Sequence, residues 1–121
     1  MPAALAGRWS SSLASEELHA PTLLWSEAAA ALRQLEYRGD VTADIAEAAL
    51  RWLETVAIKP TPSSSLIRAS RQVAMQLGWA KTHDAEYVVL AQRLGAPLVT
   101  IDARLRASVA DRVTVLAPTD L

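Results

Sequence analysis

Three acidic residues stand at positions of the sequence where chemistry is expected. Asp102 follows the β-forming run PLVTI, Asp84 stands at the start of a helix-forming segment, and Glu27 lies about one turn into a helix that follows a short strand. In a parallel α/β fold, each of these positions lies just beyond the carboxyl end of a strand, where ligand sites collect. The spacing therefore predicts that the three carboxylates share one edge of a sheet.

Carboxylates that gather at one edge repel one another unless a cation occupies the space between them. Mg²⁺ or Mn²⁺ suits such a site best, because hard divalent ions prefer carboxylate oxygens and keep waters that substrate phosphate can replace. The chemistry expected of this arrangement is metal-assisted hydrolysis of a phosphodiester, in which the cation stabilises charge on the phosphoryl and leaving oxygens.

Each of the three residues also has a purely structural interpretation. Asp84 and Asp102 could cap the helices that they begin, although a carboxylate can cap with one oxygen and bind a cation with the other. Glu27 falls within an apolar helical stripe formed by Leu24, Ala28, Ala31, Leu32 and Leu35. A charge there is costly, so Glu27 either faces a wet cleft or is neutralised by a nearby arginine.

Helices alternate with short β-forming runs along most of the chain. The predicted strands are the short LHA, TVAIKP, PLVTI and RVTVLA. The predicted helices run from Thr22, expected to act as a cap, to about Arg38, from Thr42, also expected to act as a cap, to about Glu54, from Pro62 to Gly78, through DAEYVVLAQRL to Gly95, and from Ala103 to Ala110. This alternation favours a parallel sheet that helices cover on both faces. Arg38-Gly39-Asp40 is interpreted as a tight turn between two helices.

The composition excludes several classes of protein. With 121 residues, 51% of them hydrophobic, the chain fits one globular domain, and its formal net charge of −1 gives no general attraction for polyanions. Any contact with nucleic acid must then come from a local patch or through bound cations. The absence of cysteine excludes disulfides, thiolate metal sites and cysteine nucleophiles. No secretory signal or membrane-spanning run is visible, which predicts a cytoplasmic protein without a membrane partner.

Two segments in the expected order resemble a known family. The stretch KTHDAEYVVLAQRLGAPLVTIDARL, residues 81–105, is similar to the C-terminal signature of PIN-domain ribonucleases, and among them of the VapC toxins of bacterial toxin–antitoxin pairs. The matching features are Asp84 followed by Ala85 and Tyr87, the run LAQRLGAPLVT, and Thr100 before Asp102. Upstream, LHAPTLLWSEAAAALRQL resembles the segment that carries the family's glutamate, and Glu27 matches that position.

The resemblance implies a PIN-like three-layer α/β/α fold with a short parallel sheet, formed by a single domain over residues 1–121. It also implies a Mg²⁺- or Mn²⁺-dependent endoribonuclease toxin with Glu27, Asp84 and Asp102 as catalytic metal ligands and Thr100 as a hydroxyl that supports them. The implied partners are the RNA substrate, a VapB-like antitoxin and a second copy in a homodimer, with DNA contacted only through the antitoxin.

Three basic residues near the acidic positions are candidates for contacts with RNA phosphate. His83 precedes Asp84, and Arg104 and Arg106 follow Asp102 closely. The alternative for each is a solvent-facing side chain without a role in binding.

The sequence departs from the family at its start. The family opens with an apolar strand that ends in an aspartate and lies in the middle of the sheet, whereas no acidic residue precedes Glu16 here. Either about twenty residues lie upstream of Met1, as strand-plus-helix lengths suggest, or the chain is a shortened relative in which Ala3–Trp9 or a partner's strand fills the gap. The alternative function is therefore a catalytically inactive PIN scaffold that binds an antitoxin-like partner.

Overall fold

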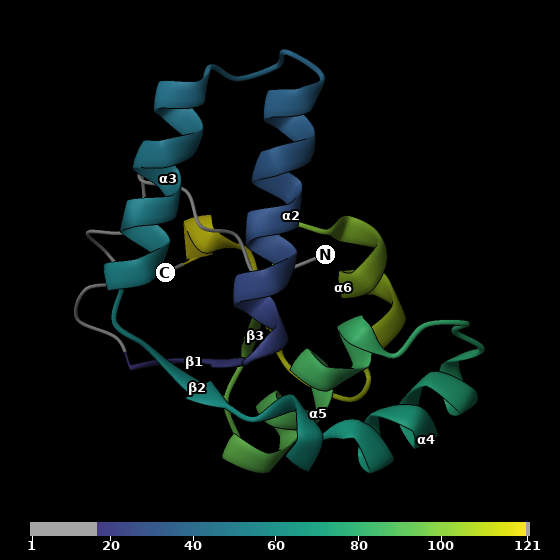
Figure 1. Cartoon of the computed structure of the whole chain (residues 1–121). Helices are drawn as coiled ribbons and strands as arrows, with labels where there is room; N and C mark the ends of the chain where they lie inside the picture. The colour runs from purple at the N-terminus through teal and green to yellow at the C-terminus, as the bar shows by residue number, and fades with distance from the viewer. Residues whose placement is uncertain (1–16, 121) are drawn as a thin grey trace.

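The structure is a computed structural model, and it describes residues 17–120. Five α-helices and four short strands follow one another in this part of the chain (Figure 1). In chain order they are β1 (Leu18–Pro21), α2 (Leu23–Tyr37), α3 (Ala43–Thr55), β2 (Ile58–Thr61), the 3₁₀ turn η1 (Ser63–Ser65), α4 (Ile67–Leu77), α5 (His83–Leu94), β3 (Leu98–Val99), α6 (Ala103–Val109), β4 (Val115–Leu116) and the 3₁₀ turn η2 (Pro118–Asp120). The predicted alternation of helices and strands is confirmed.

Several helix ends follow from local sequence signals. α4 and α5 stop at Gly78 and Gly95, whose φ angles of 71° and 60° lie in the left-handed region that glycine adopts without strain. Thr42 caps α3, because its hydroxyl accepts a hydrogen bond from the backbone N–H of Ile45 at 3.3 Å. The predicted turn at residues 38–40 is also confirmed, with Gly39 at a φ of 80°.

The strands form two separate parallel pairs rather than one sheet. β1 pairs with β2 over four residues, and β3 pairs with β4 over two. The resemblance implied one short parallel sheet, whereas within residues 17–120 no strand joins the two pairs. The resemblance implies that the family's first strand lies in the middle of the sheet. The proposed substitute, Ala3–Trp9, lies outside the described residues.

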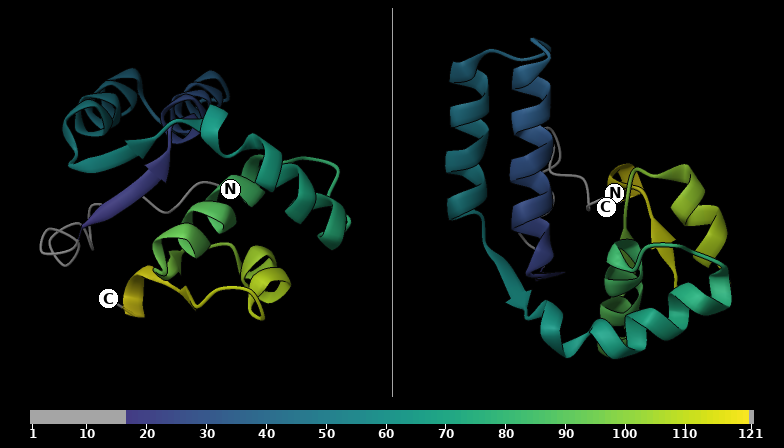
Figure 2. Two further views of the ribbon diagram at one scale, coloured as in Figure 1. Left: turned by 90° about the horizontal axis from the view of Figure 1, so that it is seen from below. Right: turned by 45° about the vertical axis from the view of Figure 1, so that its right-hand side comes forward.

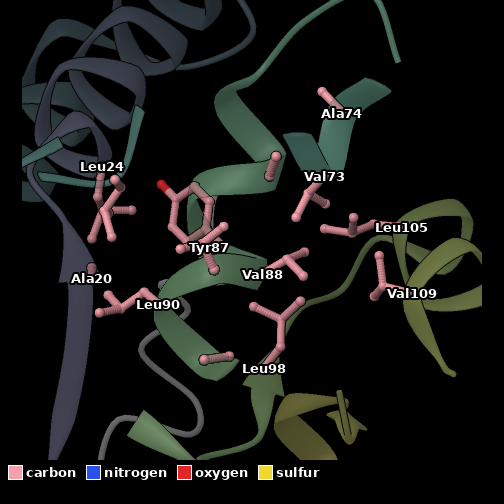
Figure 3. Close-up of a cluster of buried hydrophobic side chains, with 14 residues drawn as sticks. Ala20, Leu24, Val73, Ala74, Tyr87, Val88, Leu90, Leu98, Leu105 and Val109 are labelled. Atoms are coloured by element: carbon pink, nitrogen blue, oxygen red, sulfur yellow. The ribbon is translucent and has the colours of Figure 1, made fainter. Parts of the chain in front are cut away.

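Helix α5 is the centre of the core. All seven residues from Ala85 to Ala91 are buried, because α5 contacts both strand pairs and packs along α4. Figure 3 shows its side chains pointing in opposite directions: Tyr87 and Leu90 lie toward Leu24 and Ala20, whereas Val88 lies toward Leu105 and Val109. A helix enclosed in this way holds the residues at its N-terminus firmly relative to β1 and α2.

Helices α2 and α3 form an antiparallel hairpin that extends away from the remaining helices (Figures 1 and 2). The buried stripe predicted for α2 is correct only near the start of the helix, where Leu24 and Ala28 are buried. Ala31 is exposed and Leu32 and Leu35 are half-buried, because the far half of the hairpin has only α3 to pack against. Glu27 thus lies in the part of α2 that contacts the core.

No helix within residues 17–120 is long and apolar enough to cross a membrane.

Candidate active site

Glu27 on α2 meets the first two turns of α5. The Tyr87 hydroxyl donates a hydrogen bond to Glu27 Oε1 at 3.0 Å, and His83 Nδ1 lies 3.8 Å from Glu27 Oε2. The Glu27 side chain keeps 22% of its surface exposed. Of the two alternatives for this charge, the structure favours the partly hydrated position, since within residues 17–120 a tyrosine and a histidine, rather than an arginine, lie beside the carboxylate.

The α5 side of this contact follows from helical spacing. His83 and Tyr87 are four residues apart, so their side chains project from one face of the helix. Tyr87 is only 5% exposed. Burial raises the pKa of its phenol above the usual range for tyrosine, and the neighbouring Glu27 carboxylate raises this pKa further, with smaller contributions from Asp84 and Glu86. Several negative charges therefore act on one buried hydroxyl.

The start of α2, which positions Glu27, is held by a contact between distant residues. We expected the Thr22 side chain to cap α2, and this was wrong: the Thr22 hydroxyl makes no cap bond to its own helix. It instead accepts a hydrogen bond from the Ser63 N–H at 3.0 Å, while Ser63 Oγ accepts one from the Leu23 N–H at 3.2 Å. Thr22 has a helical backbone, so a serine that follows β2 supplies the cap.

Asp102 is the N-cap of α6. Its Oδ1 accepts hydrogen bonds from the backbone N–H groups of Arg104 at 2.9 Å and Leu105 at 3.1 Å. Thr100, which is 3% exposed, accepts a bond from the Asp102 N–H at 3.1 Å through its hydroxyl. The capping interpretation of Asp102 is confirmed. Both cap bonds end on Oδ1, which leaves Oδ2 out of the cap.

The structure brings some of the predicted residues together and leaves others apart. Glu27 and Asp84 both lie close enough to the Tyr87 phenol to affect its pKa. Across residues 17–120 no group of three or more His, Cys, Asp or Glu side chains is arranged to hold a metal ion. Glu27 and Asp84 fit a hard divalent cation in the type of ligand atom that they offer, since both supply carboxylate oxygens near the Tyr87 phenol. The participation of Asp102 stays a prediction.

The three candidate RNA contacts have different surroundings. The His83 side chain is 62% exposed beside Glu27, so a ligand can reach it. Arg106 lies 3.6 Å from the Asp120 carboxylate, in an exposed ion pair at the end of the described chain. Arg104 is exposed on α6, and its backbone N–H belongs to the Asp102 cap.

Comparison with curated proteins decides the family. A VapC ribonuclease of Mycobacterium bovis and the ribonuclease VapC9 of Mycobacterium tuberculosis are each 36% identical to the chain over 93 residues, which cover 77% of this chain and 71% of the relative. The chain belongs to the VapC family of PIN-domain ribonucleases. No protein-family profile matches the chain. The arrangement of helices around short parallel strands is accordingly the PIN-like α/β/α fold that the sequence predicted.

VapC-family ribonucleases are in general metal-dependent, which agrees with the oxygen donors at Glu27 and Asp84.

Two further residues of α5, Tyr87 and Glu86, lie near the same carboxylates, and no role for either was predicted from the sequence of this VapC-family chain. Tyr87 was named only as a residue that matches the family motif, although its spacing of four residues from His83 already predicted that the two share a helix face. Glu86 is 4% exposed, and its Oε1 has no hydrogen-bond partner within the described part of the chain. No local pattern marks it as buried, because α5 is enclosed on all sides only in the folded chain.

Proposed function

We propose that this chain is a Mg²⁺- or Mn²⁺-dependent endoribonuclease toxin of the VapC kind, inhibited by a cognate VapB-like antitoxin. The observation that carries the proposal is the contact of Glu27 with the first two turns of α5. Glu27 and Asp84 come from distant parts of the sequence, and both lie beside the buried phenol of Tyr87. Each of them matches a position of the family's acidic cluster.

The metal ligands in this proposal are Glu27, Asp84 and Asp102. The bound cation would supply positive charge that stabilises the phosphoryl group during hydrolysis. The chain's own residues hold the ligands: the Tyr87 hydroxyl keeps one Glu27 oxygen in place, and the Thr100 hydroxyl fixes the backbone at Asp102. His83, exposed beside Glu27, can donate a hydrogen bond to an RNA phosphate.

The partners follow from the family and the charge. A net charge of −1 gives no general attraction for RNA, so binding relies on local contacts by His83, Arg104 and Arg106 and on the cation. We also propose a homodimer, an antitoxin that inserts a segment near the acidic residues, and contact with DNA only through the antitoxin.

A catalytically inactive scaffold that binds an antitoxin-like partner is the second candidate function. The observations that favour it are the two separate strand pairs and the lack, within residues 17–120, of a group of three metal-binding side chains. Under either function we propose that the chain is one PIN-like domain over residues 1–121.

An RNA cleavage assay separates the two functions. The purified chain should cut RNA with Mg²⁺ or Mn²⁺ and lose cleavage in EDTA, while Asp84→Asn and Asp102→Asn should be inactive with either metal. Asp111→Asn is the matched control, because this exposed residue follows α6 outside the proposed site. A wild-type chain that cuts no RNA with either metal, but still binds an antitoxin peptide, would support the scaffold instead.

A further inference from the structure

The hydroxyl of Tyr87 has a contact that packing alone does not require. The ring of Tyr87 belongs to the buried cluster around α5, and a phenylalanine ring would fill the same space. Figure 3 shows the hydroxyl oxygen of Tyr87 at the edge of this cluster, on the side of the ring toward Leu24 of α2. The hydroxyl donates to Glu27 Oε1 at 3.0 Å, across 60 residues of sequence.

A glutamate side chain has three rotatable bonds, so a partly exposed carboxylate samples many positions unless a partner restrains it. A hydrogen bond to a carboxylate is also stronger than one between neutral groups. The donor here is rigid, because the Tyr87 ring is 5% exposed and α5 is buried along most of its length. Such a donor selects one orientation of the Glu27 carboxylate.

We propose that Tyr87 is a positioning residue for Glu27: its hydroxyl holds Oε1 and leaves Oε2 turned toward the side of His83. This inference rests on the proposed function, in which Glu27 is a metal ligand. Groups that hydrogen-bond to metal ligands fix the orientation of those ligands and so strengthen binding. Tyr87 touches neither the cation nor the substrate in this account, and it acts only through Glu27.

The position of His83 supports this orientation. His83 Nδ1 lies 3.8 Å from Oε2, which is beyond hydrogen-bond distance, so His83 leaves Oε2 available to a ligand. The same helix that supplies the Tyr87 hydroxyl also carries Asp84. One rigid element therefore presents a proposed ligand and holds the carboxylate of another.

The test compares Tyr87→Phe with Tyr37→Phe, which removes a hydroxyl from a residue that is 80% exposed on the far end of α2. The affinity for Mn²⁺ is measured by calorimetry, together with kcat and KM for RNA and the thermal midpoint of the metal-free proteins. Tyr87→Phe should weaken Mn²⁺ binding by about 10- to 100-fold and lower kcat similarly, with KM changed by less than about twofold. Tyr37→Phe should match the wild type.

A double-mutant cycle shows whether the hydroxyl acts through Glu27. In the Glu27→Gln background, Tyr87→Phe should weaken Mn²⁺ binding by less than about twofold, because the ligand that it positions is already altered. A Tyr87→Phe protein that binds Mn²⁺ as the wild type does, with only a lower thermal midpoint, would show a structural role and overturn the inference alone. A wild-type protein that binds no Mn²⁺ would overturn the proposed metal site as well.

Discussion

The Tyr87 hydroxyl on α5 donates a hydrogen bond to Glu27 Oε1 on α2, at 3.0 Å. This contact joins the two segments by which the chain resembles its family, and it is made at the point where α2 enters the core. The tertiary fold therefore brings the Glu27 and Asp84 carboxylates near Tyr87, since neither segment contains both of them.

Tyr87 should resist ionisation in the folded protein. Burial and the Glu27 carboxylate both disfavour the phenolate, so the pKa of Tyr87 is raised. In Tyr37→Phe, Tyr87 is the one tyrosine left. The ultraviolet absorbance of this variant should show no phenolate near pH 10, the ordinary value for tyrosine, until the protein unfolds. Phenolate absorbance from folded protein near that pH would show that the hydroxyl is solvated.

The same shift predicts how stability depends on pH. A group with a raised pKa contributes its stability fully below the unfolded value and loses it as the pH rises. The free energy of unfolding of Tyr37→Phe should therefore fall above about pH 10, by up to about 1.4 kcal/mol per pH unit from Tyr87. Denaturant unfolding between pH 8 and pH 11 measures this slope, and the Tyr37→Phe/Tyr87→Phe double variant, which has no tyrosine, should lose that component.

Replacing Glu86 should stabilise the metal-free protein. Glu86 is 4% exposed, and within residues 17–120 its Oε1 lacks a hydrogen-bond partner, which carries a desolvation cost. Glu86→Met keeps a similar length and removes both oxygens, so the free energy of unfolding should rise by about 1 to 3 kcal/mol. Urea denaturation checks this. A loss of stability would contradict the desolvation cost assigned to Glu86.

Removing the Ser63 hydroxyl should loosen the start of α2. Ser63 Oγ accepts from the Leu23 N–H and also lies 3.3 Å from the Thr22 hydroxyl, so Ser63→Ala should cost about 1 kcal/mol. Ser64→Ala is the matched control, because Ser64 is exposed in the same 3₁₀ turn. Equal thermal midpoints for the two variants would contradict the interpretation that the Ser63 side chain caps the start of α2.

The features that the sequence predicted correctly depend on local signals. The Asp102 cap and the ends of α4 and α5 at Gly78 and Gly95 are determined by residues within a few positions of one another. Contacts between distant residues could not be predicted in this way. The Ser63 bond to Leu23 spans 40 residues and the Tyr87 bond to Glu27 spans 60, and no short-range pattern carries either.

The strands show the same limit. PLVTI has the composition of a full strand, yet only Leu98 and Val99 pair with β4. Strand length depends on the partner that is present, and within residues 17–120 β3 has only β4 beside it. Composition therefore indicated where strands occur, while the break between the two pairs became visible only in the structure.

The central claim is that Glu27, Asp84 and Asp102 hold one divalent cation. Substoichiometric Mn²⁺, added to the ¹⁵N-labelled protein, broadens the amide signals of residues close to the ion. The signals of Glu27, Asp84 and Asp102 should broaden together, ahead of the exposed acidic control Asp111. Broadening of Glu27 and Asp84 with a sharp Asp102, or no selective broadening of the three, would contradict it.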